Sequence, residues 1–255
     1  MDFSSARVLL TNDDGIQGRG LIVLKKLIEP FVKEVFVIAP ELEQSGASHS
    51  LTLRQPLRIR KVSRNCYAVQ GTPTDAVLLG ISEIMKDHPP DLVLSGINAG
   101  ANLGDDVTYS GTVAAAMEGT LLGIRSLALS QVYSDRSSVD WDASRNWIKK
   151  VLDYVRNIPW PSGVLLNVNF PPIKNRLVIG IEATSQGHRK IGGELAFGVD
   201  PRGEKFYWIG QQREEKELIK GTDMEAISRG AISLTPLGLD LTHRSMLNKM
   251  RGPID

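Results

Sequence analysis

Short apolar runs alternate with helical patterns through the first half of the chain, and each run is typical of a buried strand. These runs cover residues 8–10, 34–39, 91–95 and 126–130. Two later runs, residues 164–170 and 231–234, predict further strands. A helix between these two is predicted to begin at Thr222, which forms a capping box with Glu225, and to end at Gly230.

Helices are predicted between the first strands as well. Apolar residues in the range 21–31 keep a spacing of about 3.6 residues. A second helix has a clear start, because Thr72 can cap it, Pro73 takes the first helical position and Asp75 follows three residues after the cap. A third is predicted over residues 111–123. This alternation predicts an α/β fold, a doubly wound parallel sheet with helices on both faces in three αβα layers.

Two insertions interrupt the alternation. Between residues 51 and 70, alternating apolar positions predict an antiparallel strand pair on or beside the sheet. The second insertion, residues 174–219, contains a predicted hairpin with its turn at residues 200–203. This arm either contacts a partner subunit or folds onto its own domain, and the sequence favours neither. We divide the chain into a core, residues 1–135, and a C-terminal part, residues 136–255, that completes the sheet.

Composition excludes several classes of partner. Lys and Arg total 30 against 29 Asp and Glu, so the interspersed charges give no field that would hold a nucleic-acid polymer or an anionic membrane. The chain has one cysteine, Cys66, which cannot form an internal disulfide and suits a reducing compartment. A membrane span requires about eighteen consecutive apolar residues, and the sequence has no such run. We expect a cytoplasmic protein.

Two adjacent carboxylates, Asp13 and Asp14, stand where the first apolar strand runs into Gly15. Neighbouring carboxylates repel each other, and a hard divalent cation between them would relieve that repulsion. Adjacent acids on a straight strand would diverge, so both reach one cation only if the chain turns, which Gly15 permits. The alternative is an Asp-Gly turn with solvated acids.

Two later loops also follow predicted strands and should lie near these acids, because ligands bind at the carboxyl ends of strands in a doubly wound sheet. One covers residues 43–50 and the other residues 95–112. In the longer loop, Asn98 and Asn102 offer carbonyl oxygens or amide donors. Residues 110–112 lie where the third helix begins, and its unpaired N–H groups would attract a phosphate. Ser110 and Thr112 can equally be simple helix caps.

Familiar phosphate motifs do not fit. Leu21 and Ile22 stand where a Walker A loop needs Lys and Ser or Thr, and the nearby glycines are in the wrong order for a dinucleotide fingerprint. The four histidines lack the spacing of zinc ligands. One of them, His49 in the second loop, is a candidate acid for a leaving group. The pair Asp105 and Asp106 fits a second metal or, more commonly, a turn.

The motifs together closely resemble the survival protein E (SurE) family of nucleotidases, over nearly the whole chain. The matching segments are residues 11–15 (TNDDG), 45–48 (SGAS), 71–75 (GTPTD), 95–104 (SGINAGANLG), 109–119 (YSGTVAAAMEG), 222–223 (TD) and 232–237 (ISLTPL). One departure is visible, because the family usually continues its first motif with Ala-Pro-Gly where this chain has Gly18, Arg19 and Gly20.

The resemblance implies a metal-dependent phosphatase that releases phosphate from nucleoside 5′- and 3′-monophosphates, with short polyphosphate as a further substrate. It implies one divalent cation per subunit, Mg²⁺ or Mn²⁺. The metal ligands that the family pattern gives are Asp13, Asp14, Ser45 and Asn98. The fold it implies is a Rossmann-like core whose C-terminal hairpin and helix extension joins subunits into homodimers or homotetramers, which favours the partner reading of the arm.

Our hypothesis for catalysis is that the metal activates a water for in-line attack on phosphorus, with Asp13 or Asp14 as base. The phosphate oxygens would be held by Asn102, Ser110, Gly111 and Thr112. Hence the predicted catalytic residues are Asp13, Asp14, Asn102 and Ser110. A covalent phosphate on Asp13 is the rival mechanism. A nucleotide sensor without turnover and a purely structural oligomer are the alternatives to an enzyme.

Overall fold

The computed structural model describes residues 2–135, 138–172, 177–189, 195–209 and 218–252. Its strands are β1 Arg7–Thr11, β2 Glu34–Pro40, β3 Ile59–Ser63, β4 Cys66–Val69, β5 Leu92–Ala99, β6 Arg125–Gln131, β7 Val164–Phe170, β8 Ile181–Ala183, β9 Leu195–Val199, β10 Lys205–Ile209 and β11 Ile232–Gly238. Its α-helices are α1 Arg19–Ile28, α2 Pro73–Leu79, α3 Gly111–Leu121, α4 Asp142–Val155, α5 Asp223–Arg229 and α6 Arg244–Met250.

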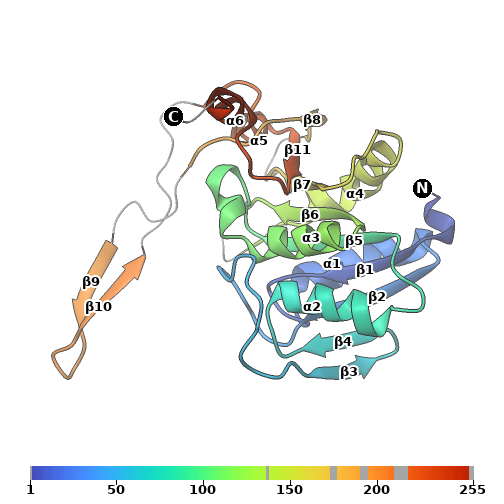
Figure 1. Cartoon of the computed structure of the whole chain (residues 1–255), viewed down its shortest axis with the longest axis horizontal. Helices are drawn as coiled ribbons and strands as arrows, with labels where there is room; N and C mark the ends of the chain where they lie inside the picture. The colour runs from blue at the N-terminus through green and yellow to red at the C-terminus, as the bar shows by residue number, and fades with distance from the viewer. Residues whose placement is uncertain (1, 136–137, 173–176, 190–194, 210–217, 253–255) are drawn as a thin grey trace.

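One nine-stranded sheet runs through the body of the protein in the order β3-β4-β2-β1-β5-β6-β7-β11-β8 (Figure 1). The six strands from β4 to β7 in this order are parallel. Their order reverses between β1 and β5, as in the doubly wound dinucleotide-binding sheets. Antiparallel pairs flank these six strands, β3 with β4 on one side and β11 with β7 on the other, and the edge strand β8 is parallel to β11. The predicted α/β Rossmann-like fold is confirmed.

Helices cover both faces of the sheet. The larger core, on the face covered by α1 and α4, includes Leu24 and Val151. On the other face, Val77 of α2 and Ala115 of α3 pack against Leu9 of β1. Successive residues of β1 therefore enter opposite cores, because side chains alternate across a strand and a central strand is buried on both faces.

Local sequence signals fix several of these elements. The capping box of α2 is formed as predicted: Thr72 Oγ1 accepts from the Asp75 N–H, and the Asp75 carboxylate accepts from the Thr72 N–H at 2.9 Å. The predicted helix over residues 21–31 instead ends as an α-helix at Ile28, and a 3₁₀ turn follows through Pro30. Proline cannot donate the backbone hydrogen bond that continues an α-helix.

Two predictions near the C-terminus need correction. Thr222 caps α5, but the Glu225 carboxylate accepts from the Gly221 N–H rather than from that of Thr222, so the capping box is incomplete. The last strand extends to Gly238, past its predicted end at residue 234, and includes Pro236. Pro236 is tolerated there because β8 pairs with β11 no further than Leu234, so no partner needs the missing N–H.

The strand pair expected between residues 51 and 70 is present at the edge of the sheet. β3 is antiparallel to β4, and β4 adds parallel to β2. The predicted hairpin is β9 with β10, and it projects beyond the main body (Figure 1). Residues 174–176, 190–194 and 210–217 of the predicted arm lie outside the described residues. Within the described part of the chain, no helix has the length and apolar content needed to cross a membrane.

A buried carboxylate joins the long loop after β5 to the C-terminal part of the chain. Asp223 is fully buried, and its carboxylate accepts hydrogen bonds from the N–H groups of Gly104 at 2.9 Å, Gly187 at 2.8 Å and Met224 at 2.8 Å. Arg189 supports the same junction, because its Nε donates to Asp106 at 2.9 Å. The pair Asp105 and Asp106 therefore belongs to a turn held by a salt bridge, which favours the turn interpretation over a second metal.

Asp223→Ala is expected to destabilise the protein by about 3 kcal/mol, because three buried N–H groups would lose their acceptor. Urea unfolding followed by circular dichroism measures this change. The control is Asp87→Ala, which removes an exposed acid. Equal stability of the two variants would show that Asp223 does not hold the junction.

Candidate active site

Three loops meet at the carboxyl ends of β1, β2 and β5, where the strand order reverses. Gly15 has a φ of +88°, and a Cβ there would lie 3.0 Å from the carbonyl carbon of Leu42, so only glycine fits this turn easily. The loop after β2 is joined to the first by the Gln44 N–H, which donates to the carbonyl of Asp13 at 2.7 Å. The chain therefore turns at the paired acids, as their joint use requires.

Asp13, which follows β1, packs against the first turn of α3 and is 5% exposed. Its Oδ1 accepts from the Thr112 hydroxyl at 2.5 Å. Gly111 leaves room for it, since a Cβ at this position would lie 2.7 Å from the Asp13 Cβ. Burial raises the pKa of Asp13, while the hydrogen bonds from Thr112 oppose that rise. Hence Asp13 is held in one position by Thr112, and its burial disfavours the charged form.

Asp14 is less enclosed and differs in its surroundings. Burial, together with the negative charges of Asp13 and Glu43, raises its pKa from 3.8 to about 6, and a hydrogen bond from the Ala99 N–H at the end of β5 opposes the rise. Among the described residues, neither Asp13 nor Asp14 forms an ion pair with Lys or Arg. Within the described ranges, no Lys or Arg at ion-pair distance offsets the repulsion between these acids.

Asn98 and Ser45 are chain neighbours of Ala99 and Gln44, whose backbone N–H groups contact Asp14 and Asp13. Asn98 precedes Ala99, and its Nδ2 donates to the Gly100 carbonyl at 3.1 Å, which leaves the side-chain oxygen for another partner. Ser45 follows Gln44, and its hydroxyl donates to Glu43 at 2.8 Å while its lone pairs stay available. Within the described part of the chain, no three His, Cys, Asp or Glu side chains gather around one point. A cation here therefore depends on amide and hydroxyl oxygens besides two carboxylates.

The polar groups at the start of α3 differ in the hydrogen bonds that they already make. Ser110 caps the helix, because its Oγ accepts from the Val113 N–H at 3.1 Å. The Thr112 hydroxyl is committed to Asp13, as described above. Gly111 presents its N–H group at the first helical position, where the positive end of the helix dipole adds to it. Capping and phosphate binding are compatible at Ser110 and Gly111, whereas the Thr112 side chain orients an acid.

Asn102 belongs to the loop between β5 and α3, and it is buried. Its Nδ2 donates to Ser130 of β6 at 2.8 Å, and its backbone N–H donates to the Asn169 side chain of β7 at 2.9 Å. The Asn102 carbonyl accepts from Asn167 at 2.8 Å and from Asn169 at 3.1 Å. These contacts tie the loop to the ends of β6 and β7. Only one hydrogen of the Asn102 amide remains for a phosphate.

Sequence reasoning missed several partners of the candidate residues. Glu118 of α3 is 7% exposed and its Oε2 lies 3.0 Å from His49 Nε2. Asn169 and its neighbour Asn167 hold Asn102 from another strand. The signal for Glu118 was a single acid in a helix of otherwise small and apolar residues, which requires a partner when buried.

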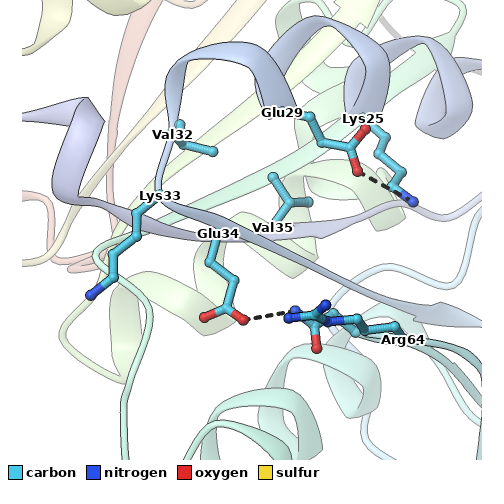
Figure 2. A pocket seen from close by; sticks show the side chains of 8 residues that line it. Lys25, Glu29, Val32, Lys33, Glu34, Val35 and Arg64 are labelled. Atoms are coloured by element: carbon cyan, nitrogen blue, oxygen red, sulfur yellow. Dashed lines mark hydrogen bonds and ion pairs between the residues drawn. The ribbon is translucent and has the colours of Figure 1, made fainter.

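A surface pocket lies elsewhere, at the amino end of β2 (Figure 2). Its lining residues are Lys25, Glu29, Val32, Lys33, Glu34, Val35, Arg64 and Asn65. Several of its charges are already satisfied, with Lys25 3.4 Å from Glu29 and Asn65 donating to Glu34 at 2.9 Å. Because ligands of this fold bind at the carboxyl ends of the strands, the paired acids mark the better candidate site.

Comparisons with known proteins agree with the fold described above. The model of the family described as Survival protein SurE matches residues 8–193. A relative named 5′-nucleotidase SurE, from Paramagnetospirillum magneticum, is 56% identical over 243 residues, covering 95% of this chain and 94% of its own length. The protein of the same name from Rhodospirillum rubrum is 49% identical over 254 residues, covering 98% and 97%. The crystal structure of SurE from Aquifex aeolicus has a TM-score of 0.84 at 39% identity, covering 96% of this chain and 98% of that one. The chain therefore belongs to the SurE family.

Proposed function

We propose that this protein is a 5′-nucleotidase that uses a divalent cation to hydrolyse nucleoside monophosphates, with 3′-monophosphates and short polyphosphate as further substrates. The observation that carries the proposal is the pair of adjacent acids at the point where the strand order reverses, with the buried Asp13 against the first turn of α3. Its relatives named 5′-nucleotidase SurE, which match nearly the full chain, support the same activity.

The four proposed ligands fit Mg²⁺ or Mn²⁺. Asp13, Asp14, Asn98 and Ser45 offer only oxygen atoms, which these hard cations prefer. The fit rests on two observations, the unneutralised acids and an Asn98 amide whose nitrogen is already engaged. When bound, such a cation lowers the pKa of a coordinated water and withdraws charge from a phosphate oxygen.

The chain's own residues then divide the remaining work. Asp13, fixed by Thr112, positions the site. Asp14, with its raised pKa, can accept the proton of the attacking water near neutral pH. Ser110 and Gly111 would meet the phosphate oxygens at the N-terminus of α3, and Asn102 belongs to the loop that precedes this helix. Trapping of phosphate on Asp13 during turnover would decide instead for the covalent mechanism.

Phosphate release tests the proposal directly. The purified protein is incubated with AMP, 3′-AMP or short polyphosphate in the presence of Mg²⁺ or Mn²⁺, and inorganic phosphate is measured. We expect release that requires the cation. Tight nucleotide binding without release would contradict the proposal and favour a sensor. No effect of either cation on activity or thermal stability would favour a structural role for the acids.

Cation binding should weaken as the pH falls through about 6, because protons compete with the cation for Asp14. The measurement is the rise in melting temperature caused by Mn²⁺ across a pH series. We expect a clear rise at about pH 8 and little at about pH 5. The Asp14→Asn variant serves as the control and should lose most of the rise at every pH. A rise independent of pH would place the cation elsewhere.

The hairpin β9–β10 supports a proposal about assembly. Phe197, Tyr207 and Ile209 expose 76%, 63% and 74% of their surface on one face of the ribbon, and Trp208 exposes 69% on the other. A two-stranded ribbon with both faces in water is marginally stable by itself. We infer that a second copy of this chain covers it, giving a homodimer or homotetramer.

Replacing Phe197 and Trp208 together with serine should shift the protein to a lower mass in light scattering coupled to size exclusion. In the wild-type protein, both aromatic side chains would be removed from water by the partner copy, and serine takes away this gain. The control is Tyr154→Ser, which alters an exposed aromatic residue of α4. An unchanged mass would exclude this hairpin from the interface.

The remaining proposals concern partners and compartment. We place the enzyme in the cytoplasm, where its single cysteine, the unpaired Cys66, is compatible with a reducing environment. Because positive and negative charges nearly balance, at 30 against 29, small nucleotides rather than nucleic-acid polymers are its proposed substrates.

A further inference from the structure

His49 is held by a buried carboxylate, Glu118, which lies on the same helix whose start is the proposed phosphate site. The Glu118 side chain is 9% exposed and the His49 side chain 32%, and their closest atoms, Oε2 and Nε2, are 3.0 Å apart. An enclosed carboxylate is unfavourable unless it is paired, and His49 is the partner recorded for Glu118. The pair therefore fixes the orientation of an imidazole that still reaches solvent.

The backbone before His49 is held in a rarely used conformation. Ser48 has a φ of +53°, a region that residues other than glycine seldom adopt. Its hydroxyl donates to the Thr108 carbonyl at 2.7 Å, and its N–H donates to the Tyr109 carbonyl at 3.3 Å. Thr108 and Tyr109 directly precede Ser110, the cap of α3. Strain of this kind persists where the surroundings impose it, often at functional sites.

The contact with Glu118 also decides which ring nitrogen is available. An ionised carboxylate only accepts hydrogen bonds, so Nε2 must carry a hydrogen toward Glu118. Nδ1 has no recorded partner among the described residues. In the imidazolium form, Nδ1 also carries a hydrogen and can donate it outward.

We propose that His49 is the catalytic general acid that protonates the departing ester oxygen, and that Glu118 is the positioning residue that orients its ring. The inference rests on the proposed function, since it concerns the leaving group of the same hydrolysis. The contacts of Ser48 with Thr108 and Tyr109 hold the loop of His49 against the residues that precede the cap of α3, and the proposal places the departing nucleoside along this loop.

The proton and electron balance of this step is complete. The oxygen of the attacking water forms a bond to phosphorus, and its proton passes to the Asp14 carboxylate. The bond between phosphorus and the ester oxygen breaks, and its electron pair stays on that oxygen. The oxygen takes the Nδ1 proton of His49, which becomes neutral imidazole. Nucleoside and inorganic phosphate leave, and proton exchange with solvent restores both side chains.

Leaving-group dependence tests the role of His49. A nucleoside leaves as an alkoxide that needs a proton, whereas 4-nitrophenolate is a stable anion that needs none. We expect His49→Gln to lower kcat for AMP about a hundredfold while kcat for 4-nitrophenyl phosphate stays nearly unchanged. Glu118→Gln should show the same selectivity with a smaller loss and an unchanged KM. The control is His88→Gln, at an exposed histidine distant in sequence from these loops.

Equal losses on both substrates would assign the pair a structural role and overturn the proposal. A rise in KM for AMP alone would overturn it too, in favour of nucleoside binding. If the wild-type protein does not hydrolyse AMP at all, the proposed function fails separately, and glycerol 2-phosphate then replaces AMP as the alkoxide substrate in the same comparison.

Discussion

Asp14→Asn should lower kcat for AMP hydrolysis about a thousandfold and, at about pH 8, raise the melting temperature of the cation-free protein. The activity falls because the variant loses both a ligand charge and the proposed base. The stability rises because the folded pKa of Asp14, about 6, exceeds its ordinary value of 3.8. Below pH 3.8, the protonated Asp14 side chain contributes favourably to the stability of the fold. This contribution is lost as the pH rises through about 6. Asparagine removes the charge at every pH.

Two measurements check the Asp14 prediction, steady-state phosphate release with Mn²⁺ and thermal melting in a chelator. Melting at about pH 4 is the internal control, because wild-type Asp14 is then largely protonated and the stability difference should nearly vanish. Asp87→Asn, at an exposed acid, controls for charge alone. A variant that keeps wild-type kcat, or that melts below wild type at about pH 8, would contradict our assignment of Asp14.

Gly111→Ala should reduce kcat about a hundredfold, although it adds a single methyl group. The new Cβ would lie 2.7 Å from the Asp13 Cβ and 2.9 Å from its Oδ2. Asp13 must move away, and with it the carboxylate that Thr112 holds. A displacement of about 1 Å in a catalytic group is enough for such a loss.

Gly238→Ala is the matched control for Gly111→Ala, because a Cβ there meets nothing within 4 Å. Far-UV circular dichroism should show both variants folded, and phosphate release should separate them. Cation affinity, measured by the melting-temperature shift with Mn²⁺, should fall for Gly111→Ala only. Wild-type activity in this variant would mean that the close approach of α3 to Asp13 has no catalytic importance.

Most of the fold could be predicted because its signals are local. The capping residues of α2 and the apolar runs of the central strands lie within a few positions of each other in the sequence. The extension of β11 through Pro236 could not be predicted in this way. Proline usually ends a strand, and only the short length of β8 beside it makes the residue acceptable.

The candidate site could be predicted in part. Asp13 and Asp14 are adjacent, so their repulsion is visible in the sequence itself. The Thr112 hydroxyl was expected to hold phosphate or to cap α3, because nothing local shows that Asp13, 99 residues earlier, accepts its hydrogen bond. The contact between His49 and Glu118 spans 69 residues and that between Gly104 and Asp223 spans 119. Such partners become neighbours only after the sheet has formed.

The link from Asp223 to Gly104 has a consequence for the order in which the enzyme matures during synthesis. After a ribosome has produced about two hundred residues, Asp13, Asp14 and the start of α3 have already emerged. The loop between β5 and α3 still lacks the carboxylate that fixes Gly104. We therefore expect the loop to reach its final geometry only after Asp223 has been synthesised, although Asn102 already ties it to β6 and β7.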